Sequence, residues 1–149
     1  MIIIADTSCI ILLDNIGELN ILQQLFGEII ITSTIAQEFG KSLPQWVTVK
    51  DPSDISKISL LLPTVDMGEA TAIALAMEIK NSILILDDDR ARKLAMTMGL
   101  KITGTLGVIL DAKKQNKINS IKPILEKIRK TNFRLSDAVF NTTLKMAGE

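Results

Sequence analysis

The stretch Met1-Ile-Ile-Ile-Ala-Asp6-Thr-Ser8 decides the fold of this chain. Its apolar run is continuous rather than alternating, which is typical of a strand buried on both faces of a parallel sheet. The run stops at Asp6, where a carboxylate is costly unless it is paired, hydrogen-bonded or bound to a metal. A second run of the same kind, Ser82-Ile-Leu-Ile-Leu86, is followed by Asp87 and Asp88. Because parallel strands end at one edge of a sheet, we expect these acids to lie together.

Strand-like runs alternate with helical patterns along the chain, which predicts an α/β fold with a central parallel sheet and helices on both faces. We expect strands at Ile2–Ala5, Glu28–Thr32, Ile83–Leu86 and Lys101–Thr103, with Trp46–Val49 as a further strand or an extended connection. Two short helices or one broken helix are expected at Ser8–Asp14 and Glu18–Phe26. Further helices are expected at Thr34–Phe39, Asp54–Leu62, Met67–Lys80, Asp88–Met98, Leu106–Gln115, Ile121–Lys130 and Asp137–Met146. Thr34, Thr105, Ser120 and Ser136 are the expected N-caps of four of them.

The size and composition of the chain narrow the class of protein. Its 149 residues suit a single domain spanning 1–149, in which helices from about residue 105 finish the fold or pack onto a partner. A single cysteine, Cys9, excludes an internal disulfide and a cysteine-rich zinc site, and we expect it to be a small buried thiol. No apolar run is long enough to span a membrane and no secretory signal is evident, so we expect a cytoplasmic protein.

Charge is divided unevenly although the net charge is zero. Residues 1–75 carry three basic and nine acidic side chains, whereas residues 76–149 carry fourteen basic and eight acidic ones. Such a division favours a phosphate-attracting surface beside an acidic site, although an ordinary solvated helical surface explains it equally well.

Two glutamates complete the acidic set, and each acid also has an ordinary structural explanation. Glu38 falls near the end of a short helix, where its negative charge is mildly unfavourable. Glu69 fits a capping box with Asp66, yet the helix that follows is apolar on nearly every side and should be buried. The structural explanation for Asp6 is that it caps the helix that starts near Ser8. The spacing does not decide whether Asp87 or Asp88 occupies the site position.

The joint pattern is more informative than any one acid. Two strand-end aspartates and two helical glutamates at one sheet edge suit Mg²⁺ or Mn²⁺, which prefer carboxylate oxygens. Such an ion orients and activates water for attack on a phosphodiester. The chain contains no histidine, which excludes histidine acid–base catalysis and histidine-built zinc sites. The stretch Gly104-Thr-Leu-Gly107 lacks the following lysine of a phosphate-binding loop.

The motifs resemble those of the PIN-domain family, the fold of VapC-type toxin ribonucleases. The resemblance is carried by Ile3-Ile-Ala-Asp-Thr-Ser8, Ile35-Ala-Gln-Glu-Phe39, Gly68-Glu-Ala-Thr-Ala-Ile-Ala-Leu-Ala76 and Leu84-Ile-Leu-Asp-Asp88, and it extends to about Gly107. The later stretches Gly104-Thr-Leu-Gly107 and Phe133-Arg-Leu-Ser136 are similar to an uncharacterised PIN-like branch. Glu69 departs from the family pattern, in which an aspartate is more usual.

The resemblance implies a three-layer α/β/α fold and a metal-dependent endoribonuclease that cleaves single-stranded RNA, as the toxin of a toxin–antitoxin pair. It implies catalytic roles for Asp6, Glu38, Glu69 and Asp88, and Mg²⁺ or Mn²⁺ held by Asp6, Glu69, Asp87 and Asp88. An antitoxin partner and a homodimer are further expectations. Thr7 or Thr105 could hydrogen-bond within the acidic set, and Arg90, Arg92 or Lys93 could contact phosphate. The alternatives are a PIN-like module that binds RNA or a protein without cleaving, and a receiver-like phosphoacceptor domain.

Overall fold

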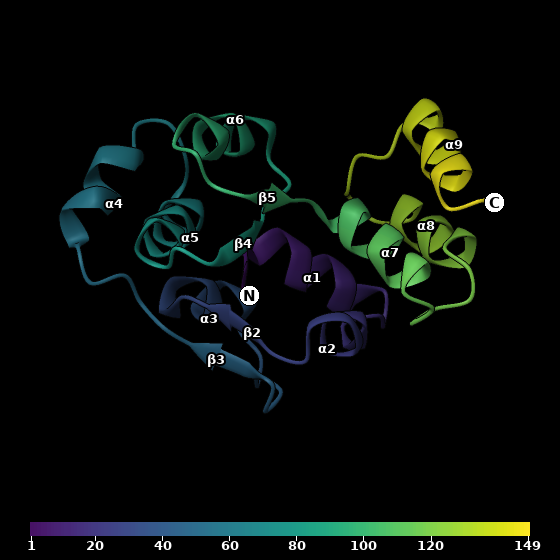
Figure 1. Ribbon diagram of the computed structural model, residues 1–149, viewed down its shortest axis with the longest axis horizontal. Coiled ribbons are helices and arrows are strands. Elements are labelled where there is room, and N and C mark those ends of the chain that lie inside the picture. Colours follow the sequence, from purple (N-terminus) through teal and green to yellow (C-terminus); the bar gives the residue numbers. More distant parts are fainter.

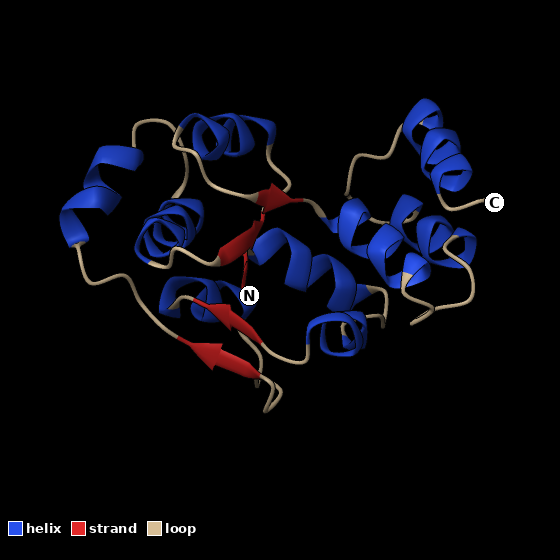
Figure 2. Ribbon diagram, in the orientation of Figure 1, coloured by secondary structure: helices blue, strands red, loops and turns tan.

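A computed structural model describes residues 1–149 as a parallel sheet of five strands with nine helices (Figures 1 and 2). The strands are β1 (Ile2–Ala5), β2 (Ile29–Ile31), β3 (Val47–Val49), β4 (Ser82–Ile85) and β5 (Ile102–Thr103). The helices are α1 (Thr7–Asn15), α2 (Asn20–Phe26), α3 (Ser33–Phe39), α4 (Ile55–Leu61), α5 (Met67–Glu78), α6 (Asp89–Thr97), α7 (Thr105–Lys114), α8 (Lys122–Arg129) and α9 (Asp137–Met146). None of them combines the length and the apolar character needed to cross a bilayer.

Helices cover both faces of the sheet, which confirms the expected three-layer α/β/α fold. In Figure 1, α5 and α6 lie on one side of the sheet, and α1, α2 and α7 lie on the other. Contacts agree with this view, because α5 packs on β1 and β4 while α2 packs on β2 and on α7. Helix α5 is buried along nearly its whole length, as its apolar sequence predicted.

The strand order β3-β2-β1-β4-β5 places β1 in the centre, paired with β2 on one side and β4 on the other. The chain leaves β1 toward β2 and returns to its other side at β4, so a topological switch point lies between β1 and β4. Ligands of open parallel sheets bind outside the carboxyl ends of the strands at such a point. Receiver-type sheets have the order 2-1-3-4-5, so the receiver-like alternative is wrong.

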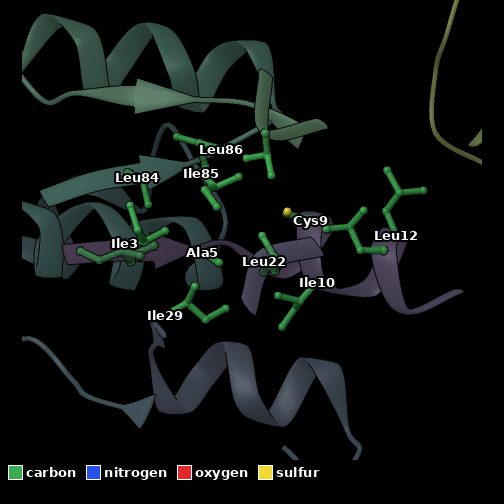
Figure 3. Packing of buried hydrophobic residues seen from close by; sticks show 14 of the residues in the cluster. Ile3, Ala5, Cys9, Ile10, Leu12, Leu22, Ile29, Leu84, Ile85 and Leu86 are labelled. Carbon is green, nitrogen blue, oxygen red and sulfur yellow. The ribbon is translucent and has the colours of Figure 1, made fainter. Parts of the chain in front are cut away.

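One continuous cluster of buried apolar side chains extends from Ile3 in β1 to Phe140 in α9. The C-terminal helices therefore contribute to the core through residues such as Ile109 and Leu125. Cys9 lies in the same interior, between the apolar side chains of the sheet and α1 (Figure 3), and is 1% exposed. This burial confirms the expectation of a small buried thiol, and it raises the pKa of the thiol to about 12.

The observed helix caps differ from the expected ones at three places. Helix α3 is capped by Thr32 rather than Thr34, and α7 follows Gly104, so that Thr105 is its first residue and not its cap. Ser120 does not cap α8, because the amides of Ile121 and Lys122 donate instead to the carboxylate of Glu149. Ser136 caps α9 by accepting from the amide of Val139, as expected.

Candidate metal centre

Three helices begin at the switch-point edge of the sheet, and an aspartate occupies the N-cap position of each. These residues are Asp6 before α1, Asp66 before α5 and Asp88 before α6. Helix N-termini carry partial positive charge and unpaired amides, which favour nearby carboxylates. The polypeptide therefore gathers acidic side chains at this edge by starting helices there.

Asp6 differs from the other two because its side chain caps nothing. It lies at the N-cap position of α1 without a capping hydrogen bond, it is 3% exposed, and its Oδ1 atom is buried without any hydrogen-bond partner. Burial raises the pKa of Asp6 to about 7; the amide of Thr7 lowers it, and the negative charges of Glu69, Asp66 and Glu38 raise it further. Helix capping does not account for this carboxylate.

Glu69 combines both of the roles that its sequence suggested. The amide of Glu69 donates to Asp66 Oδ1 at 2.8 Å, and the amide of Asp66 donates to Glu69 Oε1 at 3.1 Å, which completes the capping box. The residue is also 7% exposed. Burial raises the pKa of Glu69 to about 7, the amide of Asp66 lowers it, and the charges of Asp66 and Asp88 raise it.

Glu38 reaches the same edge from α3, although it is more exposed than the other glutamate. The hydroxyl of Thr7 donates to Glu38 Oε1 at 2.8 Å. A Cβ atom added to Gly68 would lie 2.3 Å from Glu38 Oε1 and 3.3 Å from Thr7 Oγ1. Only glycine therefore lets the Glu38 carboxylate approach the start of α5. This requirement was not predicted from the sequence, although the pair Gly68-Glu69 at a helix start is a signal for it.

A chain of buried hydroxyl groups ties the two glutamate-bearing helices together. Thr32 Oγ1 accepts from the amide of Ile35 at the start of α3 and lies 2.8 Å from Thr71 Oγ1 in α5. Thr71 in turn donates to the carbonyl of Gly68 at 2.8 Å. These hydrogen bonds fix the start of α3 against the start of α5. The local sequence around Thr32 and Thr71 predicts no such role for either residue.

Asp87 and Asp88 have different surroundings, which the sequence left open. Thr105 donates to Asp87 through its amide, at 2.8 Å to Oδ1, and through its hydroxyl, at 2.5 Å to Oδ2. Asp88 caps α6 by accepting from the amide of Ala91 at 2.9 Å, and its negative charge contributes to the raised pKa of Glu69. The charge of Asp88 therefore acts on the cluster that contains Asp6 and Glu69. Each oxygen of Asp87 instead accepts a hydrogen bond from Thr105.

The basic residues of α6 also differ in their burial and in their hydrogen bonds. Arg92 is half-buried, and its Nη1 donates to the carbonyl of Leu86 at 2.8 Å. Arg90 and Lys93 are exposed and form no ion pair. Arg92 is thus the basic residue of this helix that is fixed beside the strand-end acids.

The cluster combines an Asp6 oxygen that has no hydrogen-bond partner with two carboxyl groups, those of Asp6 and Glu69, whose pKa values are raised by burial. A cation bound there would offset the negative charges. All the donors are oxygens, as Mg²⁺ and Mn²⁺ prefer. The structure nevertheless contains no group of three or more acidic, cysteine or histidine side chains arranged as a complete ligand set. Two of the carboxylates, those of Glu69 and Asp88, are engaged by helix amides instead.

Comparison with known proteins agrees with the fold. None of the curated proteins compared with this chain matches it. A family model described as a PIN domain matches residues 2–149, which extends the resemblance beyond Gly107 through the C-terminal helices. PIN domains are generally nucleases, and the coarse class of a nuclease-type fold follows from this match. The chain belongs to the PIN-domain family.

Proposed function

We propose that this protein is a Mg²⁺- or Mn²⁺-dependent endoribonuclease that hydrolyses phosphodiester bonds of single-stranded RNA. The observation that carries the proposal is the buried Asp6 carboxylate, whose Oδ1 has no protein partner and which lies among other acids at the switch point of the sheet. An ionised carboxylate in such a place needs a cation. The PIN-domain fold supports phosphodiester cleavage as the chemistry.

The residues divide into direct and supporting roles. Asp6, Glu69 and Asp88 would hold the ion, and Asp87 would hold it through the lone pairs that its two hydrogen bonds from Thr105 leave free. When bound, the ion supplies an activated water and neutralises negative charge on the phosphate. Glu38, held by Thr7, is placed to accept a proton from water because one of its oxygens is not used in that bond.

The experiment is cleavage of a single-stranded RNA with Mg²⁺, Mn²⁺ or EDTA, combined with calorimetric titration of Mn²⁺. We expect metal-dependent cleavage that falls by at least about a hundredfold in Asp6→Asn, together with loss of Mn²⁺ binding. The matched control is Asp111→Asn, which removes an exposed aspartate of α7 away from this edge. Equal cleavage by Asp6→Asn and the parent protein would exclude the assigned role of Asp6.

A second candidate is a PIN-like module that binds RNA or a protein without cleaving it. The observation that favours it is the lack of a complete ligand set, since Glu69 and Asp88 serve as helix caps and Asp87 is bound by Thr105. Binding of RNA that persists in EDTA, with no cleavage under any divalent metal, would select this candidate.

The biological setting is proposed from the family alone. We propose that such an RNase is the toxin of a toxin–antitoxin pair and acts as a homodimer in the cytoplasm. Growth arrest on expression of the parent protein, but not of Asp6→Asn, would support the toxin role. Sedimentation of the purified protein would give the oligomeric state directly.

A further inference from the structure

The connection between α8 and α9 brings Phe133 and Arg134 to the edge of the sheet that carries the acids. In Figure 1 this connection passes beside the link between β5 and α7. A cavity of about 390 Å³ lies at that place, and its lining includes Phe133 and Arg134 together with Asp87, Arg92 and Gly104. This volume is within the range of roughly 300–1,000 Å³ that is typical of pockets for small ligands.

Phe133 also lines a second cavity, of about 280 Å³. The other lining residues include Ser8 and Asn15 of α1 and Asn132 of the connection. Phe133 therefore stands between two neighbouring hollows. One hollow reaches Asp87, and the other reaches Ser8, which is two residues beyond Asp6. The first hollow therefore borders the candidate metal centre at Asp87, while none of the acids lines the second.

The charges around the first cavity suit a phosphate. Arg134 is exposed and forms no ion pair, and Arg92 uses one nitrogen to bond the carbonyl of Leu86, which leaves other N–H groups available. Both oxygens of the Asp87 carboxylate already accept a hydrogen bond from Thr105. Asp89 is the other acid in the lining, and it is exposed.

Gly104 lets the side chains of Asp87 and Arg92 lie close to the backbone beside this cavity. A Cβ atom added to Gly104 would lie 2.9 Å from Asp87 Oδ1 and 3.1 Å from Arg92 Nη1. A side chain at this position would therefore fill the space between the aspartate and the arginine. Gly104 has an extended backbone with φ −116°, so its conformation does not require glycine. The requirement comes from the space beside the two charged groups.

We propose that Phe133 and Arg134 form a nucleotide-binding subsite for single-stranded RNA, with an unpaired base stacked on the Phe133 ring and the adjacent phosphate bound by Arg134 and Arg92. Stacking of exposed bases on aromatic rings, with arginine on the backbone, is how single strands are bound without a duplex. The polar groups of Ser8, Asn15 and Asn132 in the second hollow suit the edges of the next base or its 2′-hydroxyl. The subsite would align the strand across Asp6 and Asp88. This inference rests on the proposed function, because the acids act on the strand that the subsite holds.

The test is equilibrium binding of a short fluorescein-labelled single-stranded RNA, measured by fluorescence anisotropy in an Asp6→Asn background so that the strand stays intact. We expect Phe133→Leu, which keeps the apolar bulk without the ring face, to weaken binding about tenfold. Phe133→Trp should bind at least as tightly as the background protein. Arg134→Gln should weaken binding roughly fivefold and lower the salt slope by about one.

The control is Lys117→Gln, which removes an exposed positive charge between α7 and α8 that lines neither hollow. It should bind like the background protein. Circular dichroism and thermal unfolding identify any variant that fails to fold, and the Phe133→Trp comparison then tests the ring independently. An RNA with an abasic position should bind the background protein more weakly than the intact RNA does. In Phe133→Leu the difference between the two RNAs should be smaller, because the ring on which the base would stack is absent.

The outcomes separate this inference from the proposed function. If the parent protein cleaves RNA while Phe133→Leu and Arg134→Gln bind as tightly as the background, the subsite is refuted and the nuclease stands. If binding depends on Phe133 but no metal supports cleavage, the subsite is supported and the nuclease is refuted. Equal affinity for double-stranded RNA would refute stacking on an unpaired base.

Discussion

Replacing Asp6 by asparagine should stabilise the metal-free protein, which is an unusual result for a change at a buried polar residue. Asp6 is 3% exposed, and its pKa of about 7 lies well above its ordinary value of 3.8. A carboxyl group whose pKa is raised by folding stabilises the folded state fully below its unfolded pKa, and this contribution is lost as the pH rises through the folded pKa. The metal-free parent should therefore lose stability between about pH 4 and pH 7.

The size of the effect follows from the shift. About three pKa units correspond to about 4 kcal/mol at 1.36 kcal/mol per unit, and this is the largest gain that a permanently neutral residue could give at pH 8. The amide of asparagine must also find partners in the same space, so we expect about 2–4 kcal/mol. For a chain of about 150 residues, 1 kcal/mol changes the Tm by roughly 2–4 °C. The variant should then melt roughly 5–15 °C above the parent protein.

The assay is thermal and denaturant unfolding in EDTA at pH 5 and pH 8, followed by the same measurements with Mn²⁺. The stabilisation by asparagine should be large at pH 8 and small at pH 5, where Asp6 is already protonated. Mn²⁺ should raise the Tm of the parent at pH 8 and leave Asp6→Asn unchanged, because binding to the folded state alone is stabilising. Asp111→Asn, at an exposed position, should match the parent throughout. If Asp6→Asn is no more stable than the parent at pH 8 in EDTA, the ionised Asp6 carboxylate does not destabilise the folded protein.

Two further predictions concern the supports of the site, and a third concerns the carboxylate that holds the start of α8. Gly68→Ala should reduce RNA cleavage at least about tenfold while changing stability by less than about 1 kcal/mol, because the new Cβ displaces the Glu38 carboxylate whereas alanine favours the helix. Thr105→Val should lower the free energy of unfolding by about 1–3 kcal/mol, because it removes the hydroxyl that donates to Asp87. Glu149→Gln should destabilise the protein above about pH 4.5 and have little effect near pH 2. The amide of Ile121 and the hydroxyl of Ser120 hold the pKa of Glu149 at about 2, so its contribution is lost as the pH falls from 4.5 toward 2.

Matched variants separate these effects from general damage. Thr97→Val removes an exposed threonine hydroxyl that bonds only within its own helix, so it should cost much less than Thr105→Val. Glu28→Gln removes an exposed glutamate before β2 and should show no change in acid stability of the kind expected for Glu149→Gln. A Gly68→Ala variant with full activity would show that Glu38 needs no close approach to α5.

Local patterns in the sequence predicted the strands and the acids because both depend on neighbouring residues. The buried runs that end at Asp6 and Leu86 identified β1 and β4, and the spacing from Asp66 to Glu69 identified the capping box. Even the strand edges shifted only slightly, with β4 ending at Ile85. Parallel pairing then brings the acids to one edge without further information.

Contacts between distant residues decided the features that the sequence did not predict. Thr32 and Thr34 are both acceptable caps locally, but Thr32 is selected by its hydrogen bond to Thr71 across the fold. Ser120 has a suitable position before α8, yet the Glu149 carboxylate reaches the same amide from the far end of the chain.

The distinction between Asp87 and Asp88 has the same origin. The two residues are adjacent and chemically identical, so no local pattern could separate them. Thr105, 18 residues further along, binds Asp87 and leaves Asp88 to cap α6. A sequence alone gives the acids, while the partner of each acid depends on which helix starts beside it.

Helix starts also explain how so many acids remain together in a metal-free protein. Asp66 and Asp88 accept hydrogen bonds from the first turns of α5 and α6, and such bonds to helix N-termini stabilise a carboxylate. Asp6 has no capping bond, and burial dominates its raised pKa. The cost of burying charge in the cluster thus falls on Asp6 and Glu69, and of these two only Asp6 has a buried oxygen without a hydrogen-bond partner. Asp66 and Asp88 are held in place by helix amides. Removing the capping carboxylate of Asp66 or Asp88 should therefore lower the free energy of unfolding, whereas neutralising Asp6 should raise it. The two kinds of variant should change stability in opposite directions.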